Sequence, residues 1–135
     1  MESRPWLKNY PARWDLDYSR LSLYYYLKQA ADQYPEQTAL IYNHDHVTYR
    51  EMILNIDRLA AAYTAMGLKK GDRIALLTPN CPAYVYSFYG AVRQGLIVVQ
   101  INPLLTSREL SFIVRDTKAR VLIVVDAMFP LIEEA

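Results

Sequence analysis

The chain has 135 residues, of which 53% are hydrophobic and 21% charged, and its formal net charge is +1. This length corresponds to one ordinary domain of about 100–150 residues, and the apolar fraction excludes a disordered tail. The balanced charge gives no electrostatic reason to bind nucleic acid, and the single cysteine excludes a disulfide framework within the chain. Because the sequence shows neither a membrane-spanning apolar run nor the apolar core of a signal peptide, we expect a cytoplasmic globular protein.

Residues 1–18 have neither a helical nor an alternating apolar period, and they contain Pro5 and Pro11. We expect these residues to form an extended arm whose two tryptophans, Trp6 and Trp14, pack onto the body of the protein. The body itself, residues 19–135, is predicted to be one α/β unit.

A first helix is predicted over 22–34, because apolar residues recur there at three- and four-residue steps and so share one helix face. Pro35 disfavours its continuation, since the residue before a proline is pushed out of the α region. Two short strands follow, Thr38–Tyr42 and Val47–Tyr49, joined by a polar turn at 43–46.

The second helix has a strong start signal. Thr48 and Glu51 have the spacing of a capping box, in which each side chain pairs with a backbone amide of the other residue. Gly67 supplies a left-handed stop. The buried stripe of this helix is predicted to be Met52, Ile56, Leu59, Ala60 and Tyr63.

Three short aliphatic runs, Arg73–Leu77, Ile97–Ile101 and Val121–Val125, then start at equal steps along the chain. Nearly continuous apolar strands of this length are typical of a parallel sheet that is covered on both faces. The segments between them read as helices. One runs from Pro82 to Gln94, and the other begins with a second capping box, Thr106 with Glu109.

Alternation of strands and helices at this spacing predicts a parallel βαβαβ layer with flanking helices and a short hairpin. Residues 127–135 read as the beginning of another helix, with Pro130 in its first turn. Because the series is interrupted there, we expect the α/β unit to be truncated at its C-terminal end.

Residue patterns that carry chemistry are scarce. The four glycines, Gly67, Gly71, Gly90 and Gly95, match neither GxGxxG nor GxxxxGK[ST], so no phosphate-binding loop of those types is present in the sequence. Ser87 is not part of a GxSxG nucleophile elbow and is interpreted as the small face of a packed helix.

His44 and His46 are the only histidines, and a metal would need at least one further ligand, so we interpret them as turn residues. Cys81 precedes a predicted helix, where the dipole favours negative charge, but neither histidine is near in sequence to act as its base. We therefore interpret Cys81 as a small apolar group, and we assign no catalytic residue and no metal ligand. The 12 tyrosines are interpreted as packing residues, with an aromatic-lined apolar pocket as the alternative.

Considered together, several short motifs occur in an order that closely resembles the N-terminal part of the AMP-binding, adenylate-forming acyl-CoA synthetases. The bacterial long-chain fatty acid–CoA ligases are the most similar group, and their openings also carry an arm like Pro5–Leu7 and Tyr10–Pro11. The resemblance covers essentially the whole chain. Its motifs are Val47–Met52, Gly71–Leu77, Pro79–Pro82 and the stretch from Gly95 through Asn102–Thr106.

This resemblance implies a two-step reaction in the complete enzyme. A fatty acid attacks the α-phosphate of ATP–Mg²⁺ to give an acyl-adenylate and pyrophosphate, and the thiol of CoA then displaces AMP. The phosphate loop, the ribose-binding aspartate motif and the C-terminal domain with its catalytic lysine normally follow the region present here. The resemblance therefore implies a scaffold that is inactive alone, binds no cofactor tightly, has the rest of the ligase chain as its partner and takes part in a homodimer.

The resemblance also implies a ligand-side role for the loop at Asn102, Pro103 and Leu104. It leaves the carboxyl end of a predicted parallel strand, where open α/β sheets tend to bind ligands. In related synthetases the CoA nucleotide approaches the corresponding loop. The alternative is that the loop only ends the strand and leads into the Thr106 capping box.

Two other functions stay open. The acid could be aromatic, short-chain or an amino acid, as in related adenylating enzymes, or the chain could be a non-catalytic interaction module on the same scaffold. A cytoplasmic location, including a peripheral association with membranes, is compatible with the resemblance.

Overall fold

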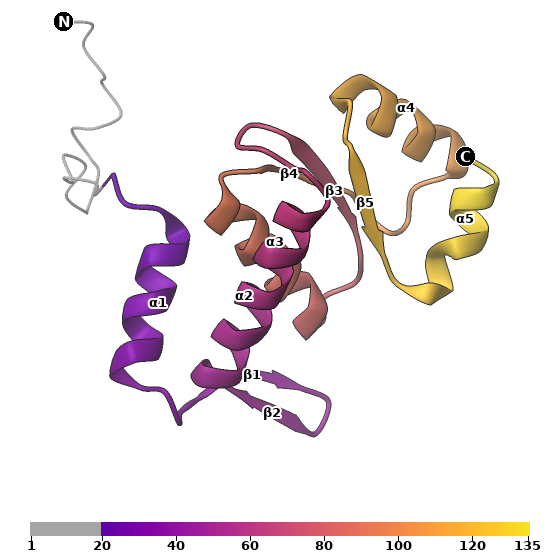
Figure 1. Cartoon of the computed structure of the whole chain (residues 1–135). Helices are drawn as coiled ribbons and strands as arrows, with labels where there is room; N and C mark the ends of the chain where they lie inside the picture. The colour runs from indigo at the N-terminus through magenta and orange to yellow at the C-terminus, as the bar shows by residue number, and fades with distance from the viewer. Residues whose placement is uncertain (1–19) are drawn as a thin grey trace, which may run out of the picture.

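The computed structural model describes residues 20–135, so the expected arm at 1–18 lies outside the described residues (Figure 1). The described chain begins with helix α1 and a β-hairpin, and continues as alternating helices and strands. The elements are α1 (Leu23–Gln33), β1 (Thr38–Tyr42), β2 (Asp45–Thr48), α2 (Tyr49–Ala65), β3 (Arg73–Leu77), α3 (Pro82–Gln94), β4 (Ile97–Gln100), α4 (Ser107–Thr117), β5 (Val121–Val124), the short 3₁₀ helix η2 (Asp126–Met128) and α5 (Phe129–Glu133).

The central sheet has three parallel strands in the order β4-β3-β5, and β1 and β2 form a separate antiparallel hairpin. In the middle strand, Ile74 is in register with Val98 of β4 and with Val121 of β5. The expected parallel βαβαβ layer with a short hairpin is therefore confirmed. Strands β4 and β5 each end one residue before the predicted boundary.

Helices cover both faces of this sheet, α2 and α3 on one face and α4 and α5 on the other (Figure 1). Because side chains alternate along a strand, Ile74 and Leu76 of β3 pack toward α2 and α3, whereas Ala75 and Leu77 pack toward α4. All four are 0–1% exposed. The sheet thus separates two apolar layers.

The second helix follows its predicted pattern closely. Thr48 is its N-cap and forms the full capping box with Glu51. Met52, Ile56, Ala60 and Tyr63 are its buried residues, and Leu59 is half-buried against the same core. Tyr63 is 1% exposed and its hydroxyl donates to the carbonyl oxygen of Ser87 on α3 at 3.3 Å.

Helices α2 and α3 approach closely at Gly90. A Cβ atom at this position would lie 3.2 Å from the carbonyl oxygen of Ile56 and 3.2 Å from Cβ of Leu59. Such a separation is tighter than ordinary van der Waals contact, so the missing side chain is what allows the two helix backbones to meet here.

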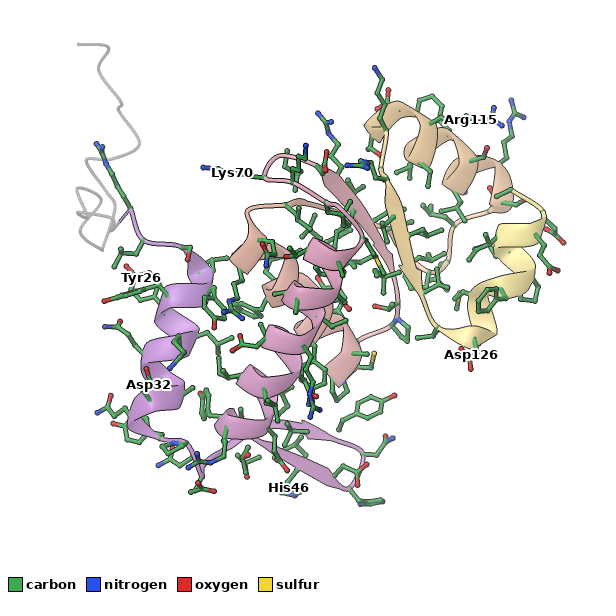
Figure 2. All side chains as sticks on the ribbon, viewed as in Figure 1. Tyr26, Asp32, His46, Lys70, Arg115 and Asp126 are labelled. Carbon is green, nitrogen blue, oxygen red and sulfur yellow. The ribbon has the colours of Figure 1, made fainter. Side chains whose placement is uncertain are left out.

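Helix α1 buries only part of its apolar face. Ala31 is buried and Leu27 and Ala30 are half-buried, whereas Leu23 and Tyr26 of the same face are 56% and 45% exposed (Figure 2). The Tyr24 hydroxyl donates to Oδ1 of Asp57 on α2 at 2.9 Å, and the Arg93 guanidinium lies 5.3 Å from the Tyr24 ring centre. The contact of α1 with the body therefore combines part of the apolar repeat with polar contacts of Tyr24.

The hairpin turn is shorter than predicted. Strand β2 begins at Asp45, which pairs with Tyr42, and Tyr49 already belongs to α2. The second strand is therefore present, but its predicted bounds, Val47–Tyr49, and the four-residue turn were wrong. Asn43 has φ 55°, and this left-handed conformation allows a two-residue turn to close the hairpin.

The C-terminal segment also differs from its expectation. Instead of one helix over 127–135, the chain forms η2 and then α5, with Pro130 in the first turn of α5. Phe129 has helical backbone angles and Pro130 lies in the first turn of α5, where its missing amide hydrogen removes no intrahelical hydrogen bond, so the proline is compatible with a helix that starts here.

Candidate functional site

The candidate site is the carboxyl edge of the parallel sheet, where the chain leaves β3, β4 and β5. The chain from β3 leads into α3 on one face, and the chain from β4 leads into α4 on the other. Adjacent strands whose connections go to opposite faces form a switch point, and open α/β sheets bind ligands in the crevice at that point. In the strand order β4-β3-β5 this switch lies between β3 and β5, because β3 leads into α3 on one face and β5 leads through η2 into α5 on the other, and the loop after β4 lies at the same carboxyl edge.

The loop after β4 contains all three residues that the sequence singled out, Asn102, Pro103 and Leu104. The Ile101 amide donates to the Leu76 carbonyl oxygen at 2.9 Å, which fixes the start of the loop against β3. The Asn102 side-chain oxygen accepts from the Leu104 amide at 3.0 Å. The Leu104 side chain is 89% exposed.

The end of this loop is fixed by α4. Thr106 and Glu109 form the second full capping box, with the Thr106 amide 2.9 Å from a Glu109 carboxylate oxygen. This backbone hydrogen bond is the main reason that the pKa of Glu109 lies below its ordinary value. The loop is thus held at both ends, while Asn102 and Leu104 between them are exposed.

Thr78 lies at the same edge, directly after β3, and was missed by sequence reasoning. Its side chain is 8% exposed and its hydroxyl has no hydrogen-bond partner. A buried hydroxyl without a partner is unfavourable by about 1–3 kcal/mol. The available signal was its position, a polar residue at the carboxyl end of a fully apolar strand.

Cys81 is the half-buried N-cap of α3, and it makes no side-chain capping bond. The His44 and His46 side chains are exposed on the hairpin. Within residues 20–135, no group of three or more His, Cys, Asp or Glu side chains could hold a metal ion. The three predicted candidates are therefore not joined into a catalytic or metal-binding cluster by the described part of the chain.

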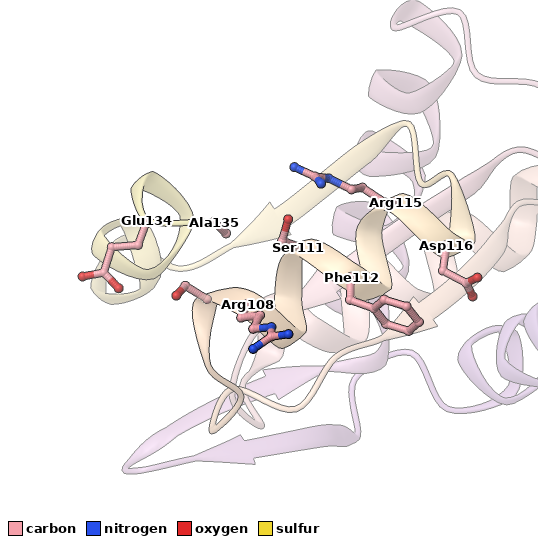
Figure 3. Close-up of a pocket in the computed structure, with 8 residues that line it drawn as sticks. Arg108, Ser111, Phe112, Arg115, Asp116, Glu134 and Ala135 are labelled. Carbon is pink, nitrogen blue, oxygen red and sulfur yellow. The ribbon is translucent and has the colours of Figure 1, made fainter.

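Apart from this edge, a hollow of about 590 Å³ lies between α4 and the end of α5 (Figure 3). Arg108 and Arg115 both line it, but they extend toward opposite sides of α4 in Figure 3. Asp116 and Glu134 add two negative charges to the same hollow. Its mixed charge and diverging guanidinium groups do not form a focused anion site.

Shifted pKa values within 20–135 occur at packing and capping positions instead of at the sheet's carboxyl edge. Burial raises the pKa of Tyr63, and burial together with the hydrogen bond to Asp57 raises that of Tyr24. The Lys69 amide, which donates to Asp72, lowers the pKa of that carboxyl, and Arg120 acts in the same direction. These groups stabilise the scaffold; they are not placed to exchange protons with a ligand at the edge.

Comparison with known proteins gives this geometry a context. The family model described as AMP-binding enzyme matches residues 27–135. A long-chain-fatty-acid–CoA ligase of Bacillus subtilis is 38% identical over 129 residues, which is 94% of this chain and 23% of the relative. A ligase of the same name from Salmonella typhimurium is 38% identical over 89% of this chain and 22% of its own length.

Solved structures agree with the sequence matches. A fatty acyl-CoA synthetase of Mycobacterium tuberculosis superposes with a TM-score of 0.79 and 35% identity, over 83% of this chain and 23% of that one. An anthranilate–CoA ligase in complex with anthranoyl-AMP gives a TM-score of 0.81 and 34% identity, over 84% of this chain and 22% of that one. The chain thus spans about a quarter of the length of its relatives, and it belongs to the AMP-binding enzyme family.

Proposed function

We propose that the chain is the N-terminal scaffold of an ATP-dependent long-chain fatty acid–CoA ligase. The observation that carries this proposal is the 38% identity to long-chain-fatty-acid–CoA ligases across 94% of the chain. In the proposed reaction, a fatty acid attacks the α-phosphate of ATP with Mg²⁺ present, which gives an acyl-adenylate and pyrophosphate. The thiol of CoA then attacks the acyl carbon and releases AMP.

The proposed role of this chain is to brace the remainder of the ligase and to shape one wall of its active site. The doubly covered sheet supplies rigidity, and its carboxyl edge presents the loop at Asn102, Pro103 and Leu104. We propose that this loop lies on the CoA side of the complete enzyme. Its anchored ends and exposed Leu104 support such a role, because a contact loop needs a fixed base and an accessible tip.

The 135-residue sequence contains no Ser/Thr/Gly-rich loop ending in Pro-Lys-Gly and no Thr-Gly-Asp motif. We therefore propose that the chain alone binds neither ATP nor CoA tightly and does not form acyl-adenylates. The test is ATP–pyrophosphate exchange with palmitate, comparing the purified 135-residue chain with a longer ligase that contains it. Exchange by the longer protein alone is expected, whereas clear exchange by the 135-residue chain would contradict the proposed division of labour.

A second candidate function is activation of an aromatic acid. It is favoured by the anthranilate–CoA ligase, which superposes as well as the fatty acyl-CoA synthetase does. Thioester formation by the longer protein with palmitate, octanoate, benzoate and anthranilate separates the two. Preference for palmitate supports the first function, and preference for anthranilate or benzoate supports the second.

A non-catalytic interaction module is the remaining alternative, and it predicts no thioester formation with any acid by the longer protein.

We propose a cytoplasmic location with peripheral access to membranes. No helix in the described part of the chain has the length and apolarity that a membrane crossing requires. We also propose a homodimer for the complete ligase, which sedimentation equilibrium would test directly.

A further inference from the structure

An apolar pocket of about 320 Å³ lies between the hairpin and the start of α3, and its lining does not include Asn102, Pro103 or Leu104. This volume is at the lower end of the range for small-molecule sites, about 300–1,000 Å³. Strand β1 forms one wall, and the β3–α3 connection with the first turns of α3 forms the other. The lining residues are Leu40, Ile41, Tyr42, Asn80, Cys81, Pro82, Tyr84 and Val85.

The chemistry of this lining is suited to an alkyl chain. Leu40, Ile41, Pro82 and Val85 are aliphatic, and no charged side chain lines the pocket. Ile41 is 68% exposed, so this large apolar side chain of the hairpin is mostly uncovered by other parts of the described chain. Burial of apolar surface on a ligand would therefore stabilise the complex without removing any charge from water.

The end of the pocket at Asn80, Cys81 and Pro82 has a different electrostatic character, because it is the N-terminal end of α3. This helix has no acidic residue in its first turn, and its N-cap makes no side-chain hydrogen bond. The positive end of the helix dipole therefore meets no acidic side chain in its own first turn and none among the residues that line the pocket. An apolar pocket with a positive end is complementary to an alkyl chain that ends in a carboxylate.

We propose that this pocket binds a fatty acid, with the alkyl chain between β1 and α3 and the carboxylate toward Asn80 and Pro82. The proposal rests on the proposed function for the class of acid. It adds a binding site whose lining residues differ from those of the candidate CoA loop. The pocket supplies the apolar contacts with the alkyl chain, and the helix end fixes the orientation of the ligand.

Cys81 is the only cysteine of the chain and lines the pocket, so its thiol reports occupancy directly. The experiment measures the rate of Cys81 alkylation by iodoacetamide in the full chain, with hexanoate, octanoate or decanoate below their micelle-forming concentrations. Decanoate is expected to slow alkylation about tenfold at saturation. The concentration for half-protection should fall about fourfold with each added methylene, since burial of a methylene contributes about that factor.

Two variants and a matched control locate the site. Val85→Trp fills the pocket and should abolish protection, whereas Leu54→Trp, at a half-exposed position on α2 outside the lining, should leave it unchanged. Ile41→Glu tests the same wall at an exposed position where folding is not at risk, and its carboxylate should weaken decanoate binding at least tenfold. Circular dichroism establishes that each variant is folded.

Decanol, which has the same chain without the carboxylate, should protect more weakly than decanoate. Equal protection by hexanoate and decanoate, or undiminished protection in folded Ile41→Glu, would overturn the proposal. The measurements distinguish a failure of this pocket proposal from a failure of the proposed ligase function. If the longer ligase activates palmitate while Cys81 of the 135-residue chain shows no protection, this pocket alone is contradicted. If Cys81 is protected while the longer protein activates no acid, the proposed function alone is contradicted.

Discussion

The two faces of the sheet are packed to different depths. On one face, α2 buries four side chains completely and α3 buries Ser87, Gly90 and Ala91. On the other face, α4 buries only Leu110, and α5 buries no residue completely. Elements with few buried apolar contacts open at lower free energy than the core does. The candidate loop at Asn102 leads into the less buried face, so we expect it to open at lower free energy than the α2–α3 face does.

The largest difference between the faces should follow from removing an aromatic ring on each. Tyr63→Ala on α2 deletes a fully buried ring and is expected to reduce the free energy of unfolding by about 3–5 kcal/mol. Phe112→Ala on α4 deletes a ring that is 69% exposed, and its effect should stay within about 0.5 kcal/mol. Urea unfolding followed by circular dichroism measures both. Similar losses in the two variants would contradict the difference in packing depth.

The helix contact at Gly90 gives a smaller and more local test. An alanine normally stabilises a helix relative to glycine by about 0.5–1 kcal/mol, but its Cβ would press on backbone atoms of α2 here. Because α2 is a rigid helix, we expect Gly90→Ala to lower the free energy of unfolding by about 1–2 kcal/mol. Ser111→Ala on the opposite face is the control, with an expected change within about 0.5 kcal/mol. A stabilised Gly90→Ala protein would show that the helices separate easily.

The two capping boxes allow the faces to be compared with the same chemistry. Thr48→Ala and Thr106→Ala each remove an N-cap hydroxyl, and each should cost about 1 kcal/mol of helix stability. The location of the effect should differ. Hydrogen exchange should accelerate only in α4 and its preceding loop for Thr106→Ala, whereas Thr48→Ala should accelerate exchange throughout the α2–α3 face. If exchange accelerates only in the mutated helix in both variants, packing depth does not decide how far the effect of a lost cap spreads.

Much of this fold follows from local sequence signals. The capping boxes at Thr48 and Thr106 and the stop at Gly67 act over a few residues, and all three were predicted and found. The regular apolar runs likewise predicted the parallel sheet, because a strand covered on both faces has to be apolar throughout.

The differences from prediction occurred where the residue pattern does not reveal a distant contact or a backbone conformation. The contact of α1 with α2 includes the hydrogen bond from Tyr24 to Asp57, which no repeat in the helix reveals. The hairpin turn depends on the left-handed conformation of Asn43. The loop at Asn102 follows β4, as its place after an apolar run predicted, and its role as a site stays a prediction. The pocket beside Cys81 could not be located from the sequence, because it is defined by packing between separate elements.

The smallest expected effect concerns Asp72, which connects the N-terminal ends of two strands. Its carboxylate accepts from the Lys69 amide at 2.8 Å, next to the start of β3, and from the Arg120 guanidinium, next to the start of β5, at 2.5 Å. These contacts hold the pKa of Asp72 below its usual value of 3.8 in the folded protein. A lowered folded-state pKa means that the stabilisation is complete above the unfolded-state pKa and is lost as the pH falls through the folded-state pKa.

We therefore expect the free energy of unfolding of Asp72→Asn to fall less steeply than that of the unchanged protein as the pH drops below about 5. Above that pH, the pH dependence of stability should be nearly the same in both proteins. Urea midpoints measured across this interval test the expectation. Glu109→Gln is the matched comparison, since the pKa of Glu109 is also lowered but by the capping box of α4. If the contact of Asp72 links the strands that both faces share, its removal should alter the acid response of the whole domain, whereas Glu109→Gln should alter exchange in α4 first. An unchanged acid slope in Asp72→Asn would show that this surface contact does not couple the strands.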